Sequence, residues 1–228
     1  MVDGVPVKRV NEKHRETERR NRELRLRFET ERTAEVFYAY IATELETPIE
    51  DYANVARLVR ENLDLCGSDL LFIAAFGIIT WTAEENDMLA YMAAGLKDYS
   101  DYEKAVYYYL EALDAEKMHD YGPPRRAEAM KQKMADCLKK SIDYRPFPQS
   151  CFLYCRRVER DEEVLALGFS AIERTRCDED LRTGTAALAR TCQGYIDELI
   201  LGIEMSDWTQ EYYAEQFGYR GWKALETT

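Results

Sequence analysis

The sequence predicts an all-α protein. Helix start and stop signals recur at short intervals along the 228 residues, whereas 11 Gly and 6 Pro are too few for the many turns of a sandwich or barrel. Hydrophobic residues make up 46% of the chain, which is enough to bury a core. The two stretches rich in Ile, 72–80 and 198–203, lie inside longer helical patterns. We therefore expect about nine or ten helices with short links and no strand.

The first 30 residues are predicted to form a charged helical arm ahead of a helical-repeat domain at 31–228. The arm holds nine Lys and Arg against six Asp and Glu, with the two signs interspersed as in a solvated helix. Leu24 and Phe28 are its first apolar pair at helical spacing, so they mark where it joins the body. Because few apolar residues precede them, we expect residues 1–22 to fray or project, and their deletion to leave the melting temperature nearly unchanged.

The first elements of the body follow from their end signals. No helix breaker stands between about residues 11 and 46, which predicts one continuous helix. Thr47-Pro48-Ile49-Glu50 combines an N-cap, a proline at the first helical position and a capping-box Glu. The helix that it starts should run to Cys66, with Gly67 as its C-terminal glycine. Residues 68–81 are apolar almost all round, so this helix is predicted to be the buried centre.

Capping boxes and prolines place the remaining helices. Thr82-Ala-Glu-Glu85 and Ser100-Asp-Tyr-Glu103 are capping boxes that predict helices near 83–98 and 101–118. The later helices are bounded by Gly122-Pro123-Pro124, Pro146, Pro148 and Ser206-Asp207, and are expected near 125–143, 149–158, 161–175, 180–204 and 207–216.

Residues 89–113 carry the one resemblance to a known family. Their turn, Ser100 to Ala105, is close to the Gly-Asp-Tyr-Glu-Glu-Ala of the tetratricopeptide repeat, and Tyr109, Ala112 and Leu113 stand where that family has an aromatic residue, Ala and Leu. The segment therefore resembles a tetratricopeptide repeat, with a weaker echo at 160–172. It departs from the family at Met92-Ala93, where Leu-Gly is usual, and at Lys117-Met118, where a proline is usual. Ala93 and Ala105 are expected where two helices cross closely.

The resemblance implies antiparallel helical hairpins stacked as a tetratricopeptide-like α-solenoid. It also implies a non-catalytic adaptor or regulatory protein that binds a protein or peptide, alone or as a subunit of a larger complex. Tyr107, Tyr108 and Tyr109 are consecutive in the sequence, so they cannot all face one neighbour. The residues that we expect to bind a partner are Tyr99, Tyr107, Tyr108, Leu24 and Phe28. Leu24 and Phe28, at the end of the arm, are also expected to contribute to self-association.

Charge and hydropathy exclude several functions. The net charge is −12, and the 198 residues after the arm carry −15, which repels phosphate backbones. We therefore expect no direct nucleic-acid binding by the acidic body. The most apolar run, Leu70 to Trp81, is 12 residues long, well below the roughly 20 that span a bilayer. With no apolar signal-peptide segment at the N-terminus, a cytoplasmic protein without membrane contact is expected.

Catalytic and metal-binding patterns are poorly represented. The six cysteines are expected to be reduced thiols; Cys151 and Cys155 lie four apart, but no CxxC accompanies them. Glu116 and His119 have the Glu-x-x-His spacing of di-iron bundles, yet His14 is the only other histidine and supplies no second motif. The sequence also lacks phosphate-binding glycine loops. We expect no catalysis, cofactor or metal.

Two other functions stay open. An acidic inhibitor or nucleic-acid mimic would block a basic surface, and it would present rows of acidic residues on a convex face. A small-molecule or thiol enzyme, the less favoured of the two, would need a closed pocket that contains His119 or a reactive cysteine.

Overall fold

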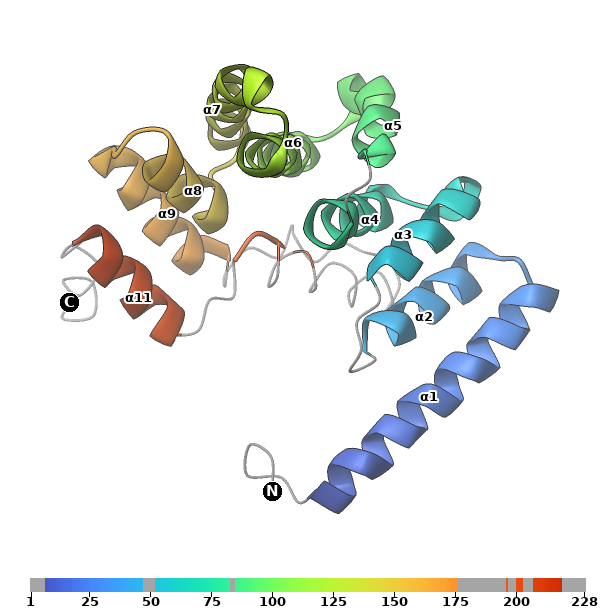
Figure 1. Cartoon of the computed structure of the whole chain (residues 1–228). Helices are drawn as coiled ribbons and strands as arrows, with labels where there is room; N and C mark the ends of the chain where they lie inside the picture. Colours follow the sequence, from blue (N-terminus) through green and yellow to red (C-terminus); the bar gives the residue numbers. More distant parts are fainter. Residues whose placement is uncertain are drawn as a thin grey trace.

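The structure, a computed structural model, describes residues 7–46, 52–82, 85–175, 196, 200–202 and 207–218. Every regular element in these ranges is a helix and none is a strand, which confirms the all-α prediction. Figure 1 shows the helices following one another along a curved row. The α-helices are α1 (Val7–Thr30), α2 (Ala34–Leu45), α3 (Tyr52–Glu61), α4 (Ser68–Trp81), α5 (Asp87–Gly95), α6 (Asp101–Tyr121), α7 (Ala127–Tyr144), α8 (Pro148–Arg157), α9 (Glu162–Thr175) and α11 (Asp207–Phe217).

Neighbouring helices pair as hairpins. Among the described elements, α6 and α7 share the most extensive contact, and α1 with α2, α3 with α4, and α8 with α9 form the other main pairs. The short helix α5 touches both α4 and α6 but is not the main partner of either. The expected hairpin of residues 89–113, made of α5 and α6, is therefore not the principal unit. The reason is burial: α5 buries only Met88, Leu89 and Met92, whereas α6 presents a long apolar face to α7.

The motif at 100–103 acts as a helix cap. Ser100 Oγ accepts from the Glu103 amide at 3.3 Å, and the Glu103 carboxylate accepts from the Ser100 amide at 2.8 Å, as the capping box predicts. Of the two alanines expected at close helix crossings, Ala105 is fully buried and its carbonyl accepts from Ser141 Oγ at 2.8 Å. Ala93 is exposed, so the expectation of a close crossing there is wrong, because α5 turns that residue toward solvent.

The predicted continuous helix at 11–46 is broken, although no Gly or Pro breaks it. Glu31 to Thr33 form a turn, and Thr33 caps α2 by accepting from the Val36 amide at 3.4 Å. The fold-back brings the Phe28 ring to 5.1 Å from that of Phe37. Burial of an aromatic pair therefore outweighs the one or two helical hydrogen bonds lost at the turn.

Other boundaries shift by smaller amounts. Gly67 does not end a helix that runs to Cys66; α3 ends at Glu61, a 3-10 turn follows (η1, Leu63–Leu65), and Gly67 immediately precedes α4. Helix α5 begins after Asn86, whose side chain accepts from the Leu89 amide at 3.4 Å. Two further 3-10 turns are η2 (Leu96–Asp98) and η3 (Pro124–Arg126). The predicted caps at 47–50 and most of the predicted helix at 180–204 lie outside the described residues.

Contact between the arm and the body starts well before Leu24. Thr17 is buried, and the Asn21 amide donates to Thr43 Oγ1 at 3.3 Å and to Glu44 Oε1 at 3.0 Å. The expectation that residues 1–22 fray or project is therefore wrong for their second half. Polar residues dock this half of α1, so the spacing of apolar residues gives no sign of the contact.

Deletion of residues 1–22 is now expected to lower the free energy of unfolding by about 1–2 kcal/mol, because it removes buried Thr17 and both hydrogen bonds of Asn21. Chemical denaturation of the truncated protein measures the change. Deletion of residues 1–13 is the control and should have little effect. Equal stability of the two truncated proteins would show that the second half of α1 contributes nothing to the fold.

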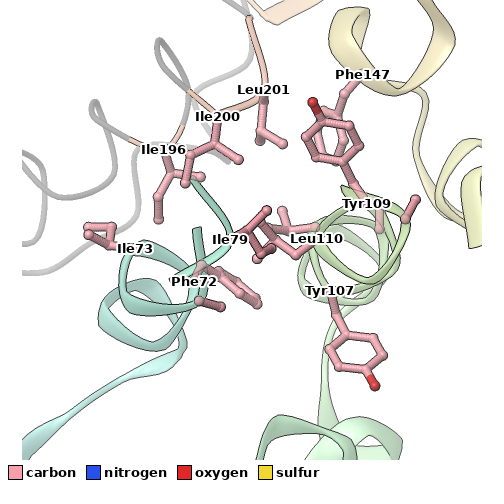
Figure 2. Close-up of a cluster of buried hydrophobic side chains, with 14 of the residues drawn as sticks. Phe72, Ile73, Ile79, Tyr107, Tyr109, Leu110, Phe147, Ile196, Ile200 and Leu201 are labelled. Carbon is pink, nitrogen blue, oxygen red and sulfur yellow. The ribbon is translucent and has the colours of Figure 1, made fainter. Parts of the chain in front are cut away.

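Helix α4 is the buried centre, as predicted. Nine of its fourteen residues are buried. Figure 2 shows Ile73 and Ile79 of α4 and Leu110 of α6 facing a common cluster with Ile196, Ile200 and Leu201. Residues far along the chain therefore complete the core around α4 and α6.

Candidate functional site

The inner side of the curved row is partly covered by the chain itself. Ile196, Ile200 and Leu201 are almost fully buried against α4 and α6 (Figure 2). The Leu201 carbonyl also accepts from the Gln149 amide at 3.3 Å, which satisfies a donor in the first turn of α8. The apolar face of α4 and α6 is therefore not open to a partner at this point.

A cleft opens beside Ile200. It has a volume of about 460 Å³ and lies between α4, α6 and α8. Tyr121, at its mouth, is 88% exposed because α6 ends there, before Gly122. The apolar side chains that line the cleft are Phe76, Ile79, Tyr109, Leu113 and Ile200.

An arginine from α8 ties together two carboxylates of α6 at the edge of the cleft. Arg157 Nε donates to Glu116 Oε1 at 2.6 Å, and its Nη2 donates to Asp120 Oδ2 at 2.7 Å. The hydrogen bond between His119 and Asp120, together with the charge of Arg157, lowers the pKa of Asp120 below its ordinary value. The carboxylate is therefore ionised at neutral pH, and the wall carries paired rather than isolated charges.

Lys117 has a structural role on the opposite wall. Its ammonium donates to the carbonyls of Ile78 at 3.1 Å and Thr82 at 2.6 Å. The Ile78 carbonyl lies in the last turn of α4 and also accepts from the Thr82 amide at 3.3 Å, while Thr82 directly follows the helix. A cation at this position also interacts favourably with the helix dipole. Lys117 thus fixes the α4 side of the cleft.

Sequence reasoning found only part of this cleft. Glu116 and His119 have the spacing of a di-iron motif, but Glu116 pairs with Arg157 and His119 pairs with Asp120. The spacing of Glu116 and Asp120, four residues apart, indicates that both carboxylates share a face of α6. Arg157 lies 41 residues from Glu116, so no local pattern indicated it.

A second recess, of about 600 Å³, lies between α1, α2 and α3. Its arginines are paired with carboxylates: Arg57 with Glu61 at 2.8 Å and Arg25 with Glu29 at 3.6 Å inside the recess, and Arg32 at 3.0 Å with Asp64, which lies outside the lining. Since its walls offer a polar surface with balanced charge and little apolar depth, we consider the cleft beside Ile200 the better candidate site.

Most of the expected partner-binding residues contribute to internal packing. Tyr107 is 6% exposed and its hydroxyl donates to Glu111 at 3.2 Å. Figure 2 shows Tyr107 and Tyr109 on opposite sides of α6, so each is buried against a different neighbour. Tyr99 packs edge-on against Phe72 at 6.2 Å, and Leu24 and Phe28 are half-buried in the packing of α1 on the body. Tyr108 is half-buried and stacks on Tyr144, which sequence reasoning did not select.

The cysteines in the described residues are structural. Cys66, Cys137 and Cys155 are free thiols, and Cys151 is buried. Burial raises the pKa of Cys66 to about 12 and of Cys137 to about 11, and it also raises that of Cys155. Within the described part of the chain, no three His, Cys, Asp or Glu side chains gather in a way that would hold a metal ion. Cys177 and Cys192 lie outside that part.

Iodoacetamide at mildly alkaline pH should label Cys66, Cys137 and Cys155 only after the protein unfolds, because the thiolate is the reactive form and burial disfavours it. Mass spectrometry of peptides from native and urea-treated protein checks this prediction. Native labelling of any of these residues at the rate of a free cysteine would identify a reactive thiol and favour the thiol-enzyme hypothesis.

Comparison with protein-family models, with curated proteins and with solved structures found no match for this chain. None of the helices within the described ranges has the length and apolar character needed to cross a lipid bilayer.

Proposed function

We propose that this protein is a non-catalytic adaptor, built as a tetratricopeptide-like α-solenoid, which binds a peptide segment of a partner protein in the cleft beside Ile200. The main support is the cleft itself, an apolar recess of about 460 Å³ with paired charges at its edge. The row of hairpins and the capping box at Ser100 are compatible with the repeat architecture.

The chemistry of the cleft suits a peptide. Phe76, Ile79 and Leu113 provide an apolar surface for one or two bulky side chains. The carboxylates of Glu116 and Asp120 accept hydrogen bonds, and the Tyr121 hydroxyl both donates and accepts. A peptide backbone needs this combination, because its N–H and C=O groups must find partners when the side chain between them is buried.

The two other functions have less support. A nucleic-acid mimic needs unpaired carboxylates in rows, but several exposed carboxylates are bound by an arginine on their own helix, as Glu16 and Glu23 are by Arg19. An enzyme centred on His119 would need that residue in the cleft, and His119 is not among the cleft-lining residues.

Selection of a random peptide library on the immobilised full-length protein, followed by affinity measurement of the enriched peptides, tests the proposal. Thr80 is exposed and lines the cleft, so Thr80→Arg places a long side chain in the recess. We expect this variant to weaken binding by at least about tenfold. Ala129→Arg, on an exposed part of α7, adds the same charge and should leave the affinity unchanged. Equal effects of both variants, or no enriched peptide, would contradict the proposal.

A further inference from the structure

A cluster of lysines and tyrosines lies along the seam between α6 and α7. Lys104 and Tyr108 come from α6, and Lys140 and Tyr144 come from α7; we call these four residues the lysine–tyrosine patch. The rings of Tyr108 and Tyr144 stack at 5.8 Å with an interplanar angle of 3°. Lys140 Nζ lies 5.0 Å from the centre of the Tyr108 ring, and Lys104 Nζ lies 5.5 Å from that of Tyr144. Each tyrosine therefore holds a lysine of the opposite helix in place.

Carboxylates neutralise the charges of these two ammonium groups only slightly. The nearest carboxylate that pairs with Lys104 is Asp101, at 3.9 Å and on an exposed side chain. Within the described ranges, Lys140 forms no ion pair, while Tyr144 is 41% exposed. By contrast, Lys133 on the same helix is bound by Glu111 at 2.5 Å. The patch thus holds two positioned cations, of which Lys140 is exposed and Lys104 is half-buried.

The α7 half of the patch, Lys140 and Tyr144, lies in the most basic part of the body. Residues 125–157 hold nine Lys and Arg against three Asp and Glu, a net charge of +6, so the other 195 residues carry −18. Two more cation–ring contacts continue along α7: Lys139 lies 6.0 Å from the ring centre of Tyr154, and Arg145 lies 5.9 Å from that of Tyr102. An acidic partner is repelled by most of this protein and attracted here.

The patch is separate from the cleft. Lys104 and Leu113 are nine residues apart on α6, which at 100° per residue places them on opposite sides of the helix. The two surfaces are therefore able to bind different segments at the same time.

We infer that the lysine–tyrosine patch is a docking surface for an acidic peptide segment of a partner protein. Carboxylates of that segment pair with Lys104 and Lys140, and the tyrosine rings keep both ammonium groups in position without neutralising them. Single-stranded nucleic acid fits less well. Each ring already packs against the other and carries a lysine, so base stacking would have to displace one of them. The −18 of the remaining chain also repels a phosphate backbone.

Fluorescence anisotropy with a labelled oligoglutamate peptide and the full chain at low salt tests this inference. The double variant Lys104→Gln/Lys140→Gln should weaken binding about tenfold, as expected for the loss of two ion pairs. The control Lys97→Gln/Lys131→Gln changes the net charge equally at exposed lysines outside the patch and should change the affinity less than about twofold. The variant Lys104→Arg/Lys140→Arg keeps both charges and should retain binding, which separates loss of charge from loss of fold.

Equal weakening by the patch and control variants would mean that net charge alone attracts the peptide, and would overturn the proposal. So would the absence of oligoglutamate binding by the unmodified protein, or tighter binding of a labelled oligothymidylate of equal charge. Peptide selection at the cleft does not involve these lysines, so failure here and failure of the proposed function are distinguishable.

Discussion

Ala105→Arg should unfold the α6–α7 hairpin and lower the free energy of unfolding by about 4 kcal/mol or more. Ala105 is fully buried, and Ser141 of α7 donates to its carbonyl at 2.8 Å, so the helices approach closely at this point. An arginine would combine overpacking with burial of an unpaired charge, and both costs are large.

Thermal and chemical denaturation measure this effect, and Ala93→Arg is the matched control. Ala93 is exposed on α5, so the same substitution there should change stability by less than about 0.5 kcal/mol. A loss of only a degree or two in the melting temperature of Ala105→Arg would show that the close contact between α6 and α7 is absent in solution.

Gly168→Leu should separate α8 from α9 and cost a net of about 1–2 kcal/mol. A Cβ atom at Gly168 would lie 2.9 Å from Cys151 Cβ and 3.1 Å from Phe152 Cε1, which is too close for either helix to stay in place. Overpacking of this kind costs about 1–3 kcal/mol, occasionally more. Replacing glycine within a helix gains only about 1 kcal/mol in helix propensity, so the steric cost dominates.

Gly95→Leu is the corresponding control, because the nearest atom to its Cβ is a ring carbon of Tyr99 at 3.8 Å, an ordinary contact distance. Urea denaturation of both variants measures how much each substitution lowers the free energy of unfolding. If Gly168→Leu proved as stable as the unmodified protein, α8 and α9 would have to pack less closely than the structure indicates.

Local signals explain which elements could be predicted from the sequence. The apolar helix at 68–81 has its predicted bounds, and the capping box at Ser100 forms both of its hydrogen bonds. Helix α11 ends one residue beyond its predicted limit. Caps, prolines and periodicity act over about four residues, so they require no knowledge of the rest of the fold.

The turn at 31–33 shows where local signals are insufficient. Neither Gly nor Pro stands there. The chain turns because Phe28 can pack against Phe37 only if α1 folds back on α2. Tyr107 is a similar case: three consecutive tyrosines must face different directions, but only the position of α7 decides that Tyr107 is buried. The basic segment at 125–157 was not predicted, because the net charge of −15 over the whole body conceals it, and Lys104 and Lys140 come together only when α6 packs on α7.

The sequence by itself determined that this protein is helical and where most of its described helices begin and end, because capping and periodicity are properties of neighbouring residues. Only the tertiary structure decided which helices pair, that Ile196, Ile200 and Leu201 cover α4 and α6, and that Arg157 joins Glu116 at the cleft. These features depend on contacts between residues tens of positions apart, which are selected by the burial and charge pairing of the whole chain.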